Sequence, residues 1–305
     1  MTGQPIVVGV DGSEPSLRAA AVGWRIAQAA KAAWRAVHAL PDVWAAASVA
    51  QVPISAAELA RRLEAEARAR LEAALAGAVP PQALARLEVR MGPAPWVIAT
   101  AAREWKAALV AVGGKRHGAL ARALGGSTAH YLVRTLDCPV LVVAPATTAI
   151  ERILVALDLS EAAPGTLAAA RWLAALLGAQ LRAVHVVEPI RFPIVLPLTI
   201  DEGEFYERSV RAFQRLVGSV EHVVRRGVAD EAIVAEAAEW RAEVIVAGSH
   251  GKSWVDRVLV GSTTERLLNT LAASLLVVPA ARALGRRRPR AGSGTRKRRG
   301  RHESR

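Results

Sequence analysis

Cysteine is almost absent from the 305-residue chain, and aromatic residues are scarce. Because Cys138 is the single cysteine, no internal disulfide can form and no paired-cysteine motif is present to bind zinc. Phe, Trp and Tyr make up only 4% of the residues, and alanine supplies much of the 52% hydrophobic content. The seven histidines are scattered without a metal-binding spacing. We therefore predict no metal site built from protein side chains.

Uncharged runs long enough to cross a membrane are also lacking. The longest reaches about 15 residues, against the ~18 that a transmembrane helix requires. The first residues have no basic region ahead of their apolar run, so we expect no signal peptide. The sequence therefore predicts a soluble, cytoplasmic protein without a membrane partner.

Positive charge is confined almost entirely to the C-terminal residues. Segment 282–305 contains eleven Lys and Arg residues against Glu303, and so carries +10 of the net charge of +13. It lacks apolar periodicity and contains Gly, Pro and Ser, which predicts a disordered basic tail. One interpretation is a solvated arm, and another is weak nonspecific binding to nucleic acid or an acidic partner. No aromatic residue lies among these basic residues to stack on bases.

The chain contains an internal repeat. An apolar run ends in Asp11-Gly12-Ser13-Glu14, and 147 residues later another ends in Asp158-Leu159-Ser160-Glu161. Further along the offset is 135, with Gly113 matching Gly248. One architecture is therefore used twice. The first copy has twelve additional residues (147 minus 135), which a long charged helix around 58–68 can absorb.

Each copy alternates short β-branched runs with longer helical patterns, which predicts parallel strands covered on both faces. In the second copy we expect strands at 153–157, 181–187, 220–224, 244–247 and 275–278, and helices at 164–177, 203–218, 230–241 and 262–271. The predicted fold class is α/β, with two tandem doubly wound, Rossmann-like domains that each contain a five-stranded parallel sheet. We place the domains at 1–147 and 148–281, followed by the tail at 282–305. The proline-rich segment 189–200 predicts a loop, either a packed connector or a flap over a crevice.

A glycine-rich segment of the second copy leads into a predicted helix. Gly248 and Gly251 leave the backbone open to close approach by a ligand. Gly261-Ser262 then begins a helix whose first N–H groups lack internal partners. A glycine loop that meets a helix N-terminus predicts a phosphate-binding site. It is not a P-loop, because Val246 occupies the position of the leading glycine.

A structural interpretation of the same helix start stays open. The run Ser262-Thr263-Thr264-Glu265 matches a capping box, in which Ser262 caps the helix and Glu265 reaches back to it. Capping and phosphate binding can both hold, because several N–H groups would remain available.

The spacing Gly248-x2-Gly251-x9-Gly261-Ser262, together with Asp158 and His185-Val186-Val187, resembles the ATP-binding members of the universal stress protein family. The resemblance covers about residues 4–281. It implies a nucleotide-binding regulatory protein of the stress response. It also implies that the last strands of the two copies, at 139–143 and 275–278, pair within one chain as a pseudo-dimer.

The resemblance implies an ATP site in the second copy, with Mg²⁺ held only through the phosphates. Asp158 and the backbone near Ala156 would contact ribose and adenine, and the main chain of Val186 would meet the adenine edge. The glycines and the helix start would hold ribose and phosphates. The predicted binding residues are Ala156, Asp158, Val186, Ala247, Gly248, His250, Gly251, Gly261, Ser262 and Thr263.

The first copy departs from this pattern, because Arg116 occupies the position of the second glycine. Its side chain can block the phosphate path, or its guanidinium can pair with phosphate. We expect binding mainly in the second copy, and a weaker site formed by Gly9, Asp11, Ala39, Gly113, Arg116, Gly126, Ser127 and Thr128.

No catalytic residue is predicted, because neither a GxSxG motif nor a base for Ser127 or Ser262 is evident. His38 and His185, at equivalent strand positions, are interpreted as packing residues, and Cys138 as a buried, inert thiol. Alternative functions are slow ATP hydrolysis or autophosphorylation, with Asp158 and His250 near the phosphates, and a nucleic-acid scaffold that uses the tail. The inducing signal, the protein partner and homodimerisation of the tandem chain stay open.

Overall fold

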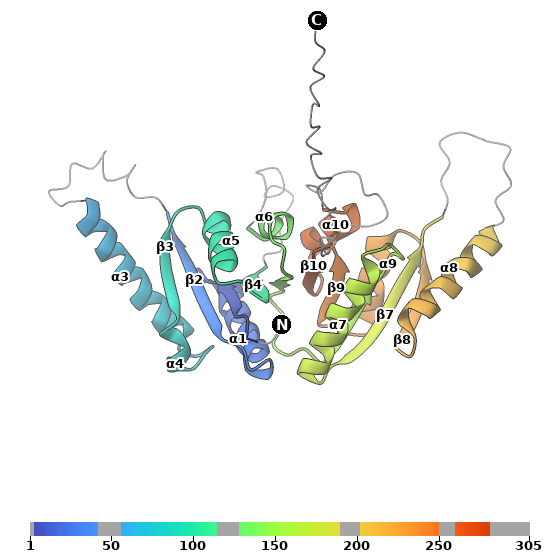
Figure 1. The fold of residues 1–305 in the computed structure, drawn as a ribbon, viewed down its shortest axis with the longest axis horizontal. Coiled ribbons are helices and arrows are strands. Elements are labelled where there is room, and N and C mark those ends of the chain that lie inside the picture. Colours follow the sequence, from blue (N-terminus) through green and yellow to red (C-terminus); the bar gives the residue numbers. More distant parts are fainter. Residues whose placement is uncertain (1–2, 42–55, 115–127, 190–201, 250–259, 281–305) are drawn as a thin grey trace, which may run out of the picture.

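The computed structural model describes residues 3–41, 56–114, 128–189, 202–249 and 260–280 (Figure 1). The strands are β1 (Ile6–Gly9), β2 (Trp34–Leu40), β3 (Leu87–Met91), β4 (Leu109–Gly113), β5 (Val140–Val143), β6 (Arg152–Ala156), β7 (Gln180–Val187), β8 (Glu221–Arg226), β9 (Val244–Gly248) and β10 (Ser274–Val278). The helices are α1 (Glu14–Ala29), α3 (Ala56–Leu75), α4 (Pro81–Leu84), α5 (Ala94–Glu104), α6 (Thr128–Thr135), α7 (Ala163–Leu177), α8 (Glu202–Val217), α9 (Ala229–Glu239) and α10 (Ser262–Thr270).

The ten strands form one sheet in the order β3-β2-β1-β4-β5-β10-β9-β6-β7-β8. Within each half, neighbouring strands are parallel. The two halves meet where β5 and β10 pair antiparallel, with Leu141 opposite Leu276. The predicted pair of five-stranded parallel units is therefore confirmed, and so is the predicted pairing of their last strands.

Two hydrophobic cores cover the two faces of the sheet. Because side chains alternate along a strand, Val8 of β1 and Val155 of β6 face one core, while Val7 and Leu154 face the other. Helices α1 and α7 supply residues to the first core, and α5, α6, α9 and α10 to the second. Figure 1 shows α1 and α7 below the centre of the sheet and α6 and α10 above it. These paired faces explain the near-continuous apolar strands in the sequence.

The two repeats differ most at their outer edges. Helix α3 has 20 residues against 16 in α8, and α4 follows it, in agreement with the expected position of the additional residues. Strand β8 runs from Glu221 to Arg226 rather than over 220–224. It is an edge strand, so it accommodates charged side chains that an apolar pattern does not identify. The loop expected at 189–200, apart from Pro189, and the tail expected at 282–305 lie outside the described residues.

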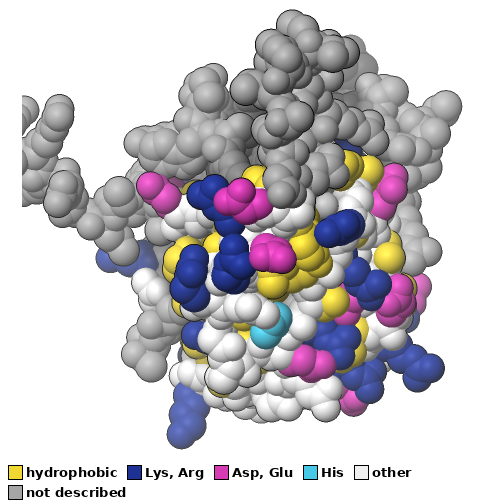
Figure 2. Space-filling view, turned by 90° about the vertical axis from the view of Figure 1, so that its right-hand side faces the viewer, with side chains coloured by type: hydrophobic (Ala, Val, Ile, Leu, Met, Phe, Trp, Pro, Cys, Tyr) yellow, Lys and Arg dark blue, Asp and Glu magenta, His cyan; other side chains and the backbone are white. Residues whose placement is uncertain are grey.

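Charged side chains of both signs intermix on the face that carries α8 and β8 (Figure 2). On α8, Arg211 lies 2.9 Å from Glu207, one turn away. Such exposed pairs contribute little to stability, and they mark a solvated helix surface. Among the described helices, none combines the length and the apolar character needed to cross a bilayer.

Buried hydrogen bonds tie the two repeats together at their junction. Ser274 begins β10 and is fully buried, and its Oγ accepts a hydrogen bond from the backbone N–H of Ala144 at 3.0 Å. The hydroxyls of Thr147 and Ser274 lie 2.7 Å apart. Above the sheet, Arg134 of α6 pairs with Glu265 of α10 at 3.2 Å. Both polar and apolar contacts therefore hold the halves in one body.

A buried carboxylate joins the outer strands of the second repeat to α9. Glu236 is 1% exposed, and it accepts hydrogen bonds from Arg182 at 2.9 Å and from Nε of Arg225 at 2.8 Å. Ala101 occupies the equivalent position of the first repeat, 135 residues earlier. In the first repeat the equivalent arginines, Arg35 and Arg90, share Glu88 of β3 instead, whose side chain is 36% exposed. The second repeat thus places the shared carboxylate on α9, where it is buried.

We predict that Glu236→Ala lowers the free energy of unfolding by about 3 kcal/mol, because two guanidinium groups lose their shared buried carboxylate. Glu239→Ala is the matched control. Its side chain is 59% exposed and also bonds Arg225, so its loss should be below about 1 kcal/mol. Urea denaturation followed by circular dichroism measures both losses, and equal losses would contradict the role of burial.

Cys138 lies two residues before β5 and is half-buried, so it is less buried than the sequence predicts. Burial raises the pKa of its thiol to about 11. Because the thiolate is the nucleophile, the native thiol should be inert near neutral pH, as the sequence analysis proposes.

We predict that Ellman's reagent labels Cys138 slowly at pH 8, where only about one thiol in a thousand is ionised. The rate should rise about tenfold per pH unit towards the pKa, and unfolding in guanidinium at pH 8 should make labelling fast. Equal rates for the native and unfolded chain at pH 8 would show that this thiol is not shielded.

Candidate functional site

Each repeat has a pocket at the carboxyl ends of its parallel strands. In the second repeat the chain proceeds from β6 to β7 and β8, and then returns to place β9 on the other side of β6. Connections that leave neighbouring strands in opposite directions open a crevice between them. Strands β1 and β4 repeat this arrangement in the first half.

The second-repeat pocket is a cavity of about 320 Å³, within the usual size of small-molecule sites. It brings together eight of the ten residues predicted from the sequence: Ala156, Asp158, Val186, Ala247, Gly248, Gly261, Ser262 and Thr263. The other two, His250 and Gly251, lie outside the described residues.

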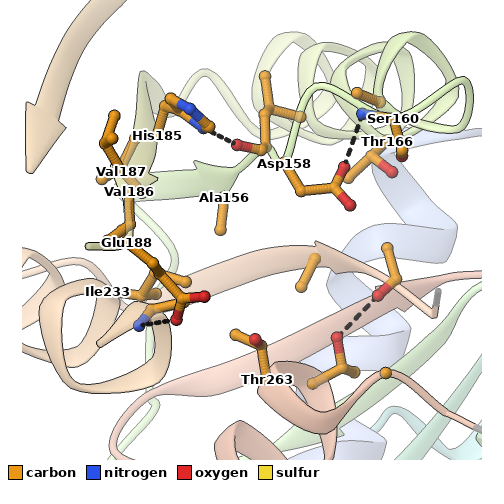
Figure 3. A pocket seen from close by; sticks show the side chains of 18 of the residues that line it. Ala156, Asp158, Ser160, Thr166, His185, Val186, Val187, Glu188, Ile233 and Thr263 are labelled. Carbon is orange, nitrogen blue, oxygen red and sulfur yellow. Dashed lines mark hydrogen bonds between the residues drawn. The ribbon is translucent and has the colours of Figure 1, made fainter. Parts of the chain in front are cut away.

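Asp158 follows β6 in a tight turn at the pocket wall (Figure 3). Its Oδ1 accepts a hydrogen bond from the backbone N–H of Ser160 at 3.1 Å, across Leu159 in the left-handed conformation (φ 60°). Its Oδ2 is buried and has no hydrogen-bond partner among the described residues. A buried carboxylate oxygen without a donor is costly, so this oxygen is a strong acceptor for a ligand hydroxyl or amine.

His185 holds the end of β6 in place. The Nδ1–H of this buried histidine donates to the carbonyl oxygen of Leu157 at 2.7 Å, directly before Asp158, and its ring packs on Phe213. His38 makes the same bond to Val10 at 2.7 Å in the first repeat. Both histidines therefore have the structural role that the sequence analysis assigns to them, and they orient the segment that carries the aspartate.

The capping box predicted at α10 is wrong. The helix begins at Ser262, its N-cap is Gly261, and no side chain caps it. The carboxylate of Glu265 bonds Arg134 instead of reaching back, because α6 of the other repeat presents a cation beside it. The first turn of α10 therefore faces the pocket without a side-chain cap, and its N–H groups carry partial positive charge.

Two further bonds shape the pocket. The hydroxyl of Thr264 donates to the carbonyl oxygen of Gly248 at 2.7 Å and joins α10 to the end of β9. On another wall, Glu188 accepts a hydrogen bond from the backbone N–H of Ala229 at 2.9 Å, at the start of α9 (Figure 3). Among the described lining residues, Asp158 and Glu188 carry charge and none is Lys or Arg.

Several residues that line the pocket were not predicted from the sequence, among them Glu188, Phe205 and Ile233. Glu188 directly follows His185-Val186-Val187, so its position in the chain could have identified it. Phe205 and Ile233 lie on α8 and α9, and no local pattern in the sequence indicates that these helices reach the pocket.

The first-repeat pocket measures about 300 Å³ and contains five of the eight predicted residues: Gly9, Asp11, Ala39, Gly113 and Thr128. The other three, Arg116, Gly126 and Ser127, lie outside the described residues.

This pocket differs from its counterpart in two ways. Asp11 accepts hydrogen bonds from both the backbone N–H and the hydroxyl of Ser13. Leu271 of the second repeat also lines it, because β10 begins beside the end of β5. Glycine at position 113 is explained by packing, because a Cβ at this position would lie 2.4 Å from the backbone of Pro15. The two pockets are therefore similar in volume and differ in the groups around their aspartates.

Comparison with known proteins gives the family. The model of the Universal stress protein family matches residues 3–144 and 149–279. Universal stress proteins of Mycobacterium tuberculosis and Mycobacterium bovis are each 30% identical over 185 residues, which cover 56% of this chain and 62% of those proteins. The matched region thus spans less than two thirds of these relatives.

A solved universal stress protein from Archaeoglobus fulgidus superposes with a TM-score of 0.61 at 19% identity, over 91% of this chain and 96% of that one. At this identity the likeness shows the shared fold. This shared fold and the two matches of the family model both agree with the strand order that occurs in each repeat. The chain therefore belongs to the universal stress protein family and carries the family's domain twice in tandem.

Proposed function

We propose that the second repeat binds an adenine nucleotide, with ATP as the expected ligand. The observation that carries this proposal is the buried, unpartnered Oδ2 of Asp158 at the pocket wall. A ribose presents neighbouring hydroxyl groups that can donate to such an oxygen. Binding would remove the cost of the unpaired acceptor, and so favours a ligand with donors at this place.

The phosphate end of the nucleotide fits the N-terminus of α10. Gly261, Ser262 and Thr263 line the pocket where this helix begins, and the helix lacks a side-chain cap. A helix N-terminus is a favourable place for phosphate. Each N–H bond to a charged oxygen contributes about 1.5–3 kcal/mol, so three or four can supply much of the ~8 kcal/mol of a micromolar complex.

The residues present fit Mg²⁺ only as a partner of the phosphates. The described residues contain no group of three or more His, Cys, Asp or Glu that could hold a metal ion. With two carboxylates and no Lys or Arg in the described lining, a triphosphate would meet negative charge. When bound, Mg²⁺ would supply the compensating positive charge.

Binding mainly in the second repeat is supported by the difference between the two aspartates. Asp158 keeps one buried oxygen, Oδ2, for a ligand, whereas Asp11 is exposed and its Oδ1 accepts both hydrogen bonds from Ser13. Leu271 also places an apolar side chain in the lining of the first pocket. We propose that the first repeat binds nucleotide weakly or not at all.

We also propose that the chain divides into domains at 1–147 and 148–281, followed by a tail at 282–305. We further propose that the protein acts in the stress response in the cytoplasm. Slow ATP hydrolysis, autophosphorylation and nucleic-acid binding stay predictions, because His250 and the tail lie outside the described residues.

We predict that Asp158→Ala weakens Mg-ATP binding at least tenfold, because the ribose loses a charged acceptor contributing about 1.5–3 kcal/mol. Asp11→Ala, the equivalent change in the first repeat, should alter the affinity less than twofold. Isothermal titration calorimetry of the full chain measures both.

Thermal unfolding without nucleotide provides the control for folding. The Asp158→Ala variant should unfold within a few degrees of the unaltered chain, because it loses one turn hydrogen bond, from the N–H of Ser160 to Oδ1, and an oxygen that has no partner among the described residues. Unchanged ATP affinity in this folded variant would refute the proposed site, and a larger effect of Asp11→Ala would assign binding to the other repeat.

A further inference from the structure

We propose that Glu188 makes the second-repeat pocket selective for bases that carry an exocyclic amino group, and that Phe205 stacks on the base. This inference rests on the proposed nucleotide site and concerns the part of it that holds the base. Both residues line the pocket, and the resemblance to the family assigns neither of them a role.

The position of the base follows from the other two parts of the ligand. Figure 3 shows Asp158, Thr263 and Glu188 on three sides of one space. If the ribose lies at Asp158 and the phosphates at the start of α10 beside Thr263, the base must occupy the third side. That side is lined by Val186 and Ile233, whose apolar side chains suit a planar ring.

Phe205 supplies an aromatic face on this side. Ser209, one turn further along α8, also lines the pocket, and Phe213, another turn along, is fully buried against His185. One face of α8 therefore points towards β7 and the pocket. Phe205 is 40% exposed, and only Trp96 is another exposed large hydrophobic residue in the described part of the chain. A planar base would cover this ring by stacking, which is a favourable contact for any base.

Glu188 would select the base through its carboxylate. Its carboxylate accepts one hydrogen bond from Ala229, and the N-terminus of α9 further stabilises its negative charge. A carboxylate has acceptor capacity for several donors and can donate none. It would accept from the amino group of adenine and would repel the carbonyl oxygen that hypoxanthine carries at the same position.

Capping of α9 is the alternative role of Glu188, and Glu188→Gln separates the two roles. The amide keeps an oxygen to accept from Ala229, and its NH₂ group can donate to a carbonyl oxygen. If Glu188 selects the base, this substitution should improve ITP binding and weaken ATP binding. If it only caps the helix, the two nucleotides should keep their relative affinities.

The experiment measures the affinities of Mg-ATP and Mg-ITP by calorimetry for the full chain and for Glu188→Gln. The unaltered chain should prefer ATP at least tenfold, and Glu188→Gln should reduce this ratio at least fivefold. Glu231→Gln is the matched control, because Glu231 lies in the first turn of α9 and does not line the described pocket. It should leave the ratio unchanged.

Phe205→Ala tests the stacking contact. It should weaken ATP and ITP equally, by at least fivefold, because stacking does not depend on the amino group. An ATP/ITP ratio in Glu188→Gln within twofold of that in the unaltered chain would overturn the selection, and undiminished affinities in Phe205→Ala would overturn the stacking. If the unaltered chain bound neither nucleotide, the proposed function itself would fail, which is a different result.

Discussion

The proposed binding site depends on the strand order around β6. The chain continues from β6 to β7 on one side and returns to place β9 on the other side. Connections from β6 and β9 leave in opposite directions, so no side chain has to fill the space above their carboxyl ends. The turn with Asp158 and the start of α10 face each other across that space. An acceptor and a set of backbone donors are thereby held at its two ends by rigid elements, which is what an elongated, charged ligand requires.

Duplication copies this arrangement, but the side chains that line the two pockets differ. Because β10 runs opposite to β5, Leu271 of the second repeat reaches the first pocket. The aspartates also differ although their positions are equivalent, since a serine hydroxyl bonds Asp11 while one oxygen of Asp158 has no partner among the described residues.

The sequence predicted what depends on local pattern and repetition. The offsets of 147 and 135 residues, with apolar runs between helical segments, predicted both parallel units, because each signal occurs in both repeats. The pairing of 139–143 with 275–278 was implied by the resemblance to the family. What the sequence could not predict depends on contacts between distant segments. Glu265 leaves the expected capping box for Arg134, which lies 131 residues away in the other repeat. Phe205 reaches the pocket from a helix across β7. The unpartnered oxygen of Asp158 is visible only once the surrounding atoms have positions.

A crystal structure of the full chain grown with saturating Mg-ATP would show whether the second repeat binds the nucleotide as proposed. The account predicts nucleotide density in the second-repeat pocket, with a ribose hydroxyl within hydrogen-bond distance of Oδ2 of Asp158 and phosphate at the first turn of α10. Density confined to the first-repeat pocket would contradict it, and so would well-ordered crystals in which Asp158 faces only water.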